Sequence, residues 1–313
     1  MSKKFVPVMI TPFTPEAKLD FDMVKVLVDF YLAAGVKGLF ANCLSSEMYS
    51  ISDDERLALT RAVVEHVNGR VPVVATGSFG LTIEDKAEFA KKIFDTGIDS
   101  VVLITGHYAA IDEGDDILLQ RFDKMLSLTD NIPLGLYECP APYKRVVTPE
   151  VLKTLVSTNR MFYHKDTCCD EAQVKAKLEV IKGTPMQFFD AHTPNGVSSM
   201  KAGAAGLSAI AGNFYPEILV WLCDHVDDPS KQKEVEWIQA ELARVDPLIH
   251  VAYPMSAKFF LQLRGLPIHA ISRAHALEPT PEEKAVLHSI LDTLKSWYEK
   301  LGIKEVVYED VAG

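Results

Sequence analysis

Lys165 is the residue of this chain whose type and position most clearly suggest chemistry. It lies near the end of a short β-prone run, FYHKD, over residues 162–166. A charged amine at the end of an otherwise buried strand is costly to desolvate unless it is neutral or paired. One interpretation is a neutral amine that forms a Schiff base with a carbonyl substrate. The alternative is a lysine that reaches solvent or pairs with Asp166.

Tyr137 ends another apolar run, and its phenol is suited to pass protons to and from a carbonyl adduct. Alternatively it is an ordinary strand tyrosine with a satisfied hydroxyl. The turn Ser45-Ser46 offers backbone amides and two hydroxyls that could hold a carboxylate, although most serine-rich turns are only turns. We expect Glu47 to brace this turn by accepting amide hydrogen bonds.

The elements that must position these residues alternate between two patterns. Between apolar runs lie segments with helical periodicity, such as 83–94, and helix starts are marked by a capping box at Ser52 and Glu55 and by Thr148-Pro149. Continuous apolar strands alternating with amphipathic helices predict a parallel sheet covered by helices. We therefore predict an α/β fold, a (β/α)8 TIM barrel, whose eight strands are residues 5–10, 38–41, 71–75, 100–104, 132–137, 161–165, 186–190 and 206–210.

A C-terminal helical extension follows the barrel. From about residue 216 the alternation stops, and helices are predicted over residues 217–226, 231–243, 247–264 and 280–301. The expected organisation is a barrel over 1–215, an extension packed on it over 216–301, and a loose tail over 302–313. The extension is also a candidate oligomer face.

In a TIM barrel, chemistry gathers at the carboxyl ends of the strands. Lys165, Tyr137 and the serine turn are then expected to line one mouth of the barrel, together with His192 just beyond the seventh run. His192 either contacts a polyhydroxylated or acidic acceptor or is hydrogen-bonded within its own loop.

Composition excludes several classes of function. The chain has 313 residues, 48% of them hydrophobic, and a formal net charge of −11, which disfavours nucleic acid and anionic membranes as partners. No apolar run reaches membrane-spanning length, and no apolar region follows Lys3-Lys4, so a cytoplasmic location is expected. Five cysteines without C-x-x-C spacing predict free thiols rather than a disulfide framework or a structural zinc site.

Short motifs follow one another in order along the chain: VPV at 6–8, TPF at 11–13, Asp20, CLSSE at 43–47, SDDER at 52–56, YECP at 137–140 and KDT at 165–167. As a set they resemble the dihydrodipicolinate synthase and N-acetylneuraminate lyase family, over roughly residues 5 to 300. No single motif is specific, but their order is.

The resemblance implies a class I aldolase-type lyase in which Lys165 forms an imine with pyruvate or a related 2-oxo acid and Tyr137 shuttles protons. Ser45 matches the hydroxyl that holds the 2-oxo acid carboxylate. Tyr108 matches a tyrosine lent across a subunit interface, which implies a homo-oligomer built as a dimer of dimers. No metal or organic cofactor is expected. The remaining expected substrate contacts are Ser46, Leu44, His192 and Ser208.

Two departures from the family pattern concern the substrate. Pro142 stands where the family's synthases carry an arginine for the second substrate's carboxylate, a contact worth about 1.5–3 kcal/mol. Leu44 stands where the family has a hydroxyl residue that links two tyrosines, a role that Ser46 or a water would then have to fill. Lys144 and Arg145 either restore the lost positive charge or form a solvated face.

The leading hypothesis is a Schiff-base lyase that carries out aldol cleavage or condensation, or dehydrates a 2-keto-3-deoxy sugar acid. One alternative is an authentic 4-hydroxy-tetrahydrodipicolinate (dihydrodipicolinate) synthase with an altered acceptor pocket. Another, of a different class, is a non-catalytic ligand-binding barrel. A metal-dependent barrel aldolase is disfavoured because none of the expected ligand spacings is present.

Overall fold

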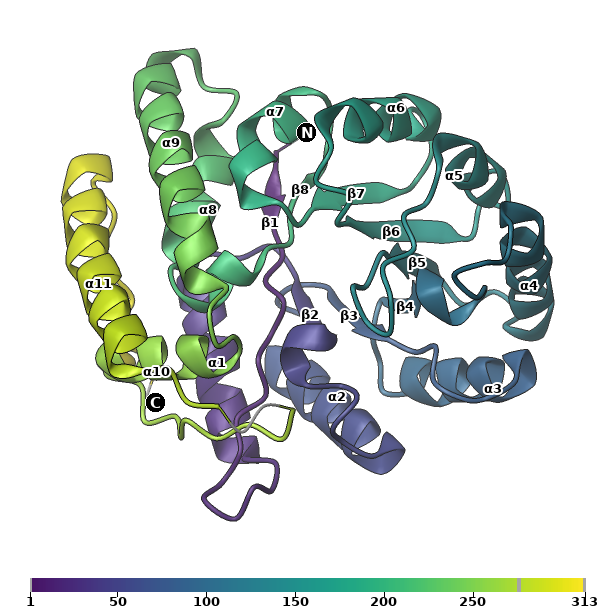
Figure 1. The fold of residues 1–313 in the computed structure, drawn as a ribbon, viewed down its shortest axis with the longest axis horizontal. Coiled ribbons are helices and arrows are strands. Elements are labelled where there is room, and N and C mark those ends of the chain that lie inside the picture. The colour runs from purple at the N-terminus through teal and green to yellow at the C-terminus, as the bar shows by residue number, and fades with distance from the viewer. Residues whose placement is uncertain (1, 275–276, 312–313) are drawn as a thin grey trace.

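The computed structural model describes residues 2–274 and 277–311, and within them it shows eight parallel strands ringed by helices (Figure 1). Neighbouring strands follow the order β1-β8-β7-β6-β5-β4-β3-β2. This arrangement confirms the predicted α/β barrel. The strands are β1 Lys4–Phe5, β2 Leu39–Asn42, β3 Val73–Thr76, β4 Ser100–Ile104, β5 Leu134–Tyr137, β6 Met161–Asp166, β7 Gln187–Asp190 and β8 Gly206–Leu207.

The first strand is much shorter than the predicted 5–10. Regular pairing of β1 with β8 stops at Phe5, and the ring is completed on its other side by a parallel bridge between Val8 and Phe40. Pro7 lies between Phe5 and Val8 in the chain and has no amide hydrogen to donate to a β-ladder. Its carbonyl still accepts from the amide of Phe40 at 3.0 Å. The segment after Phe5 is therefore irregular but remains in the wall of the barrel.

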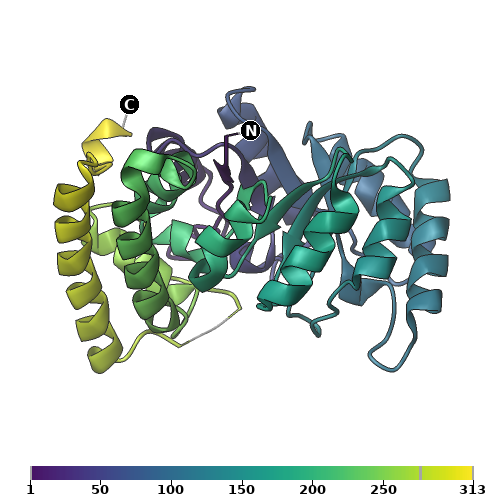
Figure 2. The same cartoon turned by 90° about the horizontal axis from the view of Figure 1, so that it is seen from above.

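The barrel helices lie outside the strands, as Figures 1 and 2 show. The capping box predicted at Ser52 is present, and Pro149 occupies the first turn of its helix. The helices that follow the strands are α1 Phe21–Ala33, α2 Asp53–Val67, α3 Ile83–Phe94, α4 Asp115–Leu128, α5 Pro149–Val156, α6 Glu171–Ile181, α7 Gly196–Lys201 and α8 Pro216–His225.

The C-terminal extension consists of α9 Gln232–Ile249, α10 Met255–Leu263 and α11 Pro281–Leu301, with α9 and α11 side by side at one edge of the barrel (Figures 1 and 2). The prediction of a helix start at Pro247 is wrong, because this proline lies inside α9. The helix continues only two residues past it and ends at Ile249.

The division of the chain near residue 216 stays a prediction. Helix α8 packs against β1 and β8, and α9 packs on α8. The C-terminal segment also contacts the body of the molecule: the amide of Val306 donates to Glu217 at 3.0 Å, and its carbonyl accepts from Arg264 at 3.0 Å. Val306 and Val311 are both buried.

Successive side chains of β6 point alternately into the barrel interior and toward the surrounding helices. In β6, Tyr163 faces the barrel interior, where its ring stacks on Phe189 at 5.0 Å and its hydroxyl donates to Ser208 at 3.1 Å. Because side chains alternate along a strand, Lys165 lies on the same face and Asp166 on the opposite one.

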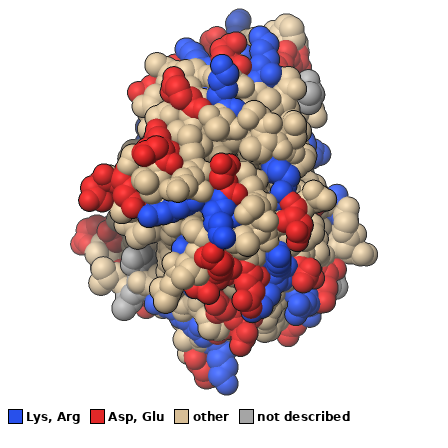
Figure 3. Space-filling view, turned by 90° about the vertical axis from the view of Figure 1, so that its right-hand side faces the viewer, with Lys and Arg blue, Asp and Glu red and all other residues tan. Residues whose placement is uncertain are grey.

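The surface seen in Figure 3, on the side of the molecule where α4 lies, carries acidic and basic side chains interspersed. Such a face lacks the continuous positive charge that a polyanion requires. Among the helices of the described residues, none is both long and apolar enough to cross a membrane.

Candidate active site

Lys165 and Tyr137 lie opposite each other on neighbouring strands. They are register partners in β5 and β6, and the Nζ of Lys165 lies 4.6 Å from the centre of the Tyr137 ring. Lys165 is only 3% exposed, and burial lowers the pKa of its amine. The alternative that this lysine reaches solvent is therefore wrong. A buried amine with a lowered pKa is the form that attacks carbonyl groups.

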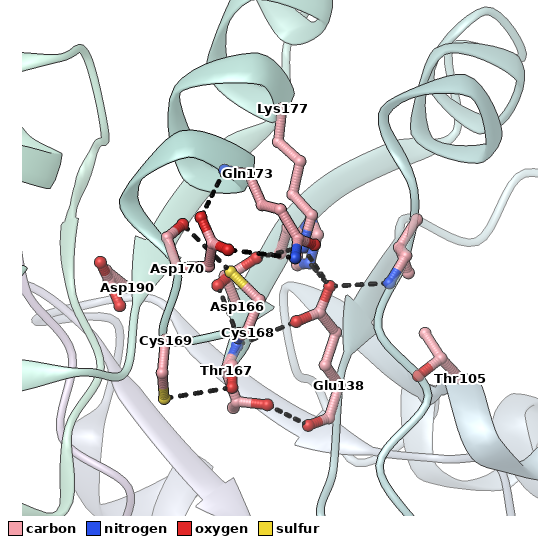
Figure 4. Close-up of polar contacts among 12 residues, drawn as sticks. Thr105, Glu138, Asp166, Thr167, Cys168, Cys169, Asp170, Gln173, Lys177 and Asp190 are labelled. Carbon is pink, nitrogen blue, oxygen red and sulfur yellow. Dashed lines mark hydrogen bonds and ion pairs between the residues drawn. The ribbon is translucent and has the colours of Figure 1, made fainter.

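Asp166 is not the partner of Lys165. Its side chain lies on the face of β6 opposite to that of Lys165, next to Lys177 from α6 (Figure 4). The Nζ of Lys177 lies 2.5 Å from the Oδ2 of Asp166 and 2.6 Å from the Oε1 of Glu138. All three side chains of this buried ion cluster are completely shielded from solvent. Glu138 follows Tyr137 and Asp166 follows Lys165, so one ammonium group joins the ends of both reactive strands.

Glu138 also holds the loops that follow these strands. Its carboxylate accepts from the amides of Val147 at 2.9 Å and Thr167 at 3.0 Å, and its carbonyl accepts from the Thr167 hydroxyl at 2.5 Å. Burial opposes ionisation, but the His164 ring 3.4 Å away and the charge of Lys177 hold the pKa of Glu138 well below its usual value. Burial alone would lower the pKa of Lys177, and its two carboxylate partners raise it instead.

Within the described residues, one group of side chains has the donors and spacing of a metal site: Glu138, His164 and Asp166, whose ligand atoms lie within 4.8 Å of one another. The Lys177 ammonium already binds both carboxylates. A divalent cation in the same space would lie against this positive charge, so the donor set fits an ion pair better than a metal. All five cysteines are free thiols, as predicted, and none belongs to this group.

The serine turn after β2 is a short 3₁₀ turn, Leu44–Ser46, and its two serines differ in role. Ser45 lines the cavity described below, next to Leu44. The Ser46 hydroxyl is fully buried, 2.7 Å from the carbonyl of Met9, and accepts from the amide of Cys43 at 3.1 Å. Ser46 thus joins the turn to the first segment of the barrel and does not line the cavity.

Glu47 ends this turn in the left-handed region, with φ 58°. Its buried carboxylate accepts from Lys258 Nζ at 2.7 Å, from the Ser272 hydroxyl at 2.8 Å, and from the amides of Arg273 and Ala274 at 2.6 and 2.9 Å. The expectation that Glu47 accepts amide hydrogen bonds is confirmed, but these amides belong to the C-terminal extension. The carboxylate therefore fixes the turn against α10 and the segment 271–274.

A cavity of about 600 Å³ opens at the carboxyl ends of the strands, with Lys165 and Tyr137 in its wall. This volume suits a small organic acid together with a second small molecule. The other residues that line it are Leu44, Ser45, Glu47, Tyr49, Ser50, Pro140, Ala141, Lys144, Thr167, Cys169, Ala191, His192, Ile210, Asp246, His250, Tyr253, Pro254 and Ala274.

Two further residues predicted for the site lie away from this cavity. Tyr108 is fully buried in its own chain, where its ring stacks on Phe122 at 4.5 Å, and its hydroxyl has no partner within the described residues. Ser208 is fully buried in the barrel interior, where it accepts from Tyr163. Neither side chain can reach a ligand in the cavity in this conformation of the chain.

Of the two candidate cations, only Lys144 lines the cavity, with its Nζ 2.7 Å from the carbonyl of Thr167. Arg145 turns away, paired with Asp115 at 2.9 Å and donating to the carbonyls of Ala110 and Glu113. Arg145 therefore does not replace the charge that is missing at Pro142.

Sequence reasoning missed the cavity residues that come from outside the strand ends. Asp246 and His250, whose side chains lie 3.3 Å apart, come from the C-terminal end of α9, and Tyr253 comes from the loop before α10. No motif marks them, because they belong to the extension and reach the mouth only through the tertiary fold. Thr167, in contrast, lies in one of the sequence motifs but was assigned no role.

Comparison with known proteins agrees with this geometry. Residues 1–294 match the Dihydrodipicolinate synthetase family. The chain belongs to this family. Two relatives of similar length show how widely the family varies around this chain. The Escherichia coli (strain K12) protein YagE, whose name proposes a 2-dehydro-3-deoxy-D-gluconate aldolase, is 28% identical over 300 residues, covering 93% of this chain and 96% of YagE. The 4-hydroxy-tetrahydrodipicolinate synthase of Bacillus subtilis (strain 168) is 26% identical over 293 residues, covering 91% and 97%.

Solved structures of the dihydrodipicolinate synthase family share the fold. The crystal structure of YagE from E. coli K12 in complex with pyruvate superposes with a TM-score of 0.84 at 24% identity, covering 94% of this chain and 98% of YagE. The dihydrodipicolinate synthase of Thermotoga maritima gives the same TM-score at 19% identity, covering 94% and 99%. The chain is thus a member of the family, and its similarity to these relatives does not determine its acceptor substrate.

Proposed function

We propose that this protein is a class I, Schiff-base-forming lyase that acts on pyruvate or a related 2-oxo acid. The observation that carries the proposal is the buried amine of Lys165, with its lowered pKa, 4.6 Å from the Tyr137 ring in the wall of an open cavity. Pyruvate, with which YagE was crystallised, is a small 2-oxo acid of this substrate class.

In the proposed reaction the neutral amine of Lys165 attacks the ketone carbon, and the carbonyl oxygen takes up a proton to give a carbinolamine. Loss of water then gives the imine. Tyr137 is the proposed proton shuttle for both steps and for the later carbon–carbon bond step. Burial raises the pKa of Tyr137 far above its usual value, so the phenol starts each cycle protonated.

For the second substrate, we propose an aldehyde released from, or added to, a 2-keto-3-deoxy sugar acid. Polar groups of both signs, Lys144, His192, His250 and Asp246, line the cavity and suit a chain of hydroxyl groups. The second candidate is a 4-hydroxy-tetrahydrodipicolinate synthase, the activity named for the Bacillus subtilis relative. For that reaction, Lys144 is the cavity lysine that would have to bind the acceptor's carboxylate in place of an arginine at 142.

The buried ion cluster supports a reaction that needs no metal, because Lys177 occupies the position between the carboxylates that a cation would take. Full activity after dialysis against a chelator is the expected result.

We also propose that the protein is a cytoplasmic homo-oligomer. Light scattering on the purified protein measures its oligomeric state, and a monomer would overturn this part of the proposal.

The imine is tested by incubating the protein with pyruvate and sodium borohydride and locating the added mass by peptide mapping. We expect the label on Lys165, no label in Lys165→Ala, and full labelling in the control Lys182→Ala, which removes an exposed surface lysine. Failure of the wild-type protein to label would overturn the proposal.

Substrate panels then separate the remaining alternatives. Turnover of 2-keto-3-deoxy sugar acids without turnover of aspartate semialdehyde supports the leading function, and the reverse result supports the synthase. Imine formation with pyruvate but no product from either panel would instead identify a ligand-binding barrel that has lost turnover.

A further inference from the structure

Tyr253 brings a phenol from the C-terminal extension to the cavity wall. It lies in the loop between α9 and α10, directly after Ala252, whose φ of 50° is in the left-handed region. This conformation is unfavourable for a residue with a side chain, and such residues persist where the surrounding structure holds them. The loop conformation thus places the Tyr253 side chain in the cavity wall at a cost in backbone energy.

The buried amide of Asn213 fixes the hydrogen-bonding role of this phenol. The Nδ2 of Asn213 donates to the carbonyl of Val8 at 2.8 Å and to the hydroxyl of Tyr253 at 2.8 Å, while its Oδ1 accepts from the hydroxyl of Tyr31 at 2.5 Å. The Val8 carbonyl can only accept, so the amide cannot be turned round. The Tyr253 oxygen is therefore an acceptor from Asn213, and its own proton must be donated elsewhere.

The remaining acceptors for this proton are Ser45 and a ligand in the cavity. Ser45 and Tyr253 line the same cavity. Burial raises the pKa of Tyr253 well above its usual value, and the side chains of Ser45 and Asn213 each lower it partly. Burial likewise raises the pKa of Tyr137, with a smaller contribution from Tyr253. The phenol of Tyr253 thus stays protonated, in a cavity wall that it shares with Ser45 and with the proposed proton shuttle, Tyr137.

We propose that the Tyr253 phenol and the Ser45 hydroxyl together bind the carboxylate of the 2-oxo acid, so that the C-terminal extension supplies a substrate-binding residue. The inference rests on the proposed function, because that function supplies the carboxylate. Two neutral donors can each satisfy one carboxylate oxygen, and the donation from Asn213 makes the phenol a stronger donor. The neighbouring Leu44 has no polar group to offer, so Tyr253 supplies the donor that position 44 lacks.

The test is Tyr253→Phe in the full-length protein, with two probes that share a ketone and differ at the acid group: pyruvate and pyruvamide. The concentration dependence of borohydride trapping on Lys165 gives an apparent Kd for each. The matched control is Tyr215→Phe, which removes a fully buried phenol that does not line the cavity and has no hydroxyl partner within the described residues. Thermal melting checks that both variants are folded.

We expect Tyr253→Phe to weaken pyruvate about 10-fold or more and pyruvamide less than 3-fold, since a hydrogen bond to a charged group is the stronger one. Tyr215→Phe should change neither affinity. Equal weakening of both probes would show that Tyr253 only supports the loop, and no weakening would show that it does not bind; either result overturns this inference while Lys165 still labels. If the wild-type protein does not label, the proposed function fails first and this inference with it.

Discussion

The amine of Lys165 lies 4.6 Å from the centre of the Tyr137 ring, and the two residues are register partners on adjacent strands. Their separation is set by the main-chain ladder of the barrel, which is among the most rigid parts of such a fold. Chemistry that passes a proton between them therefore depends on the phenol itself and little on loop motion.

Replacement of Tyr137 by Phe should lower kcat by about 10²- to 10⁴-fold, the usual contribution of a general acid–base group, with a much smaller change in the KM for pyruvate. Tyr163→Phe is the matched control, because that phenol lies two residues before Lys165 but bonds to Ser208 inside the barrel. Steady-state kinetics with a cleaved or condensed substrate measure both. A kcat within 3-fold of wild type would exclude Tyr137 as the proton shuttle.

The lowered pKa of Lys165 predicts the pH dependence of imine formation. Because burial disfavours the charged amine, the neutral form should be populated at pH values well below the ordinary 10.5. The rate of trapping by cyanoborohydride with pyruvate should rise with pH and level off with a midpoint below 10.5. A midpoint at or above that value would mean that the amine is as well solvated as a surface lysine.

Lys177→Met should destabilise the protein by about 3–5 kcal/mol, because it leaves Glu138 and Asp166 as unpaired carboxylates in a fully buried place. Lys175→Met is the control on the same helix. Its ion pair with Glu171 is more than half exposed at the lysine and should contribute less than about 1 kcal/mol.

Urea unfolding at pH 7 measures both Lys177→Met and its control. Adding Glu138→Gln to Lys177→Met should recover part of the loss, since one of the two unpaired charges is then removed. A single Lys177→Met variant within 1 kcal/mol of wild type would contradict the view that this ammonium group holds the ends of β5 and β6 together.

Asp190 should make stability fall as pH rises toward neutrality. Burial, with a smaller effect from the charge of Asp166, raises the pKa of Asp190 to about 7, whereas in the unfolded chain it ionises near 3.8. Between these values the folded state holds a proton that the unfolded state has lost, so unfolding becomes easier as pH rises and no further change follows above about pH 7.

The variant Asp190→Asn should therefore be about 4 kcal/mol more stable than wild type at pH 8 and nearly equal to it at pH 4. Its amide oxygen can still accept from the amide of His192, as the carboxylate does at 2.8 Å. Melting temperatures from pH 4 to 8 test this prediction. A difference that is constant over that range would mean that Asp190 does not titrate within it.

The sequence was sufficient to predict the barrel and to group the candidate residues at its mouth, because both follow from apolar periodicity and from the rule that strand ends meet. It left open whether Lys165 is buried or reaches solvent. It could not separate Ser45 from Ser46. Both lie in one short turn, and only the backbone geometry decides that Ser45 lines the cavity while the Ser46 hydroxyl donates to the Met9 carbonyl.

Contacts over long sequence distances were also beyond the sequence. Lys177 is 39 residues from Glu138, and Tyr253 lies outside the barrel altogether. Whether a lysine on an amphipathic helix is exposed or buried depends on the residues that pack against it in the fold. The local sequence pattern does not contain this information. The resemblance implied that Tyr108 is lent across a subunit interface, and the sequence could not show that it is buried in its own chain, because a loop residue has no periodicity to orient it.

The carboxylate of Glu47 is tied to Lys258 and to the segment 272–274, far along the chain. A shortened protein that kept only the strands and their own helices would leave that acid buried without any of these donors and would remove Tyr253 from the mouth. We therefore expect the isolated barrel to be inactive. Designs that change the specificity of this barrel must include its last three helices.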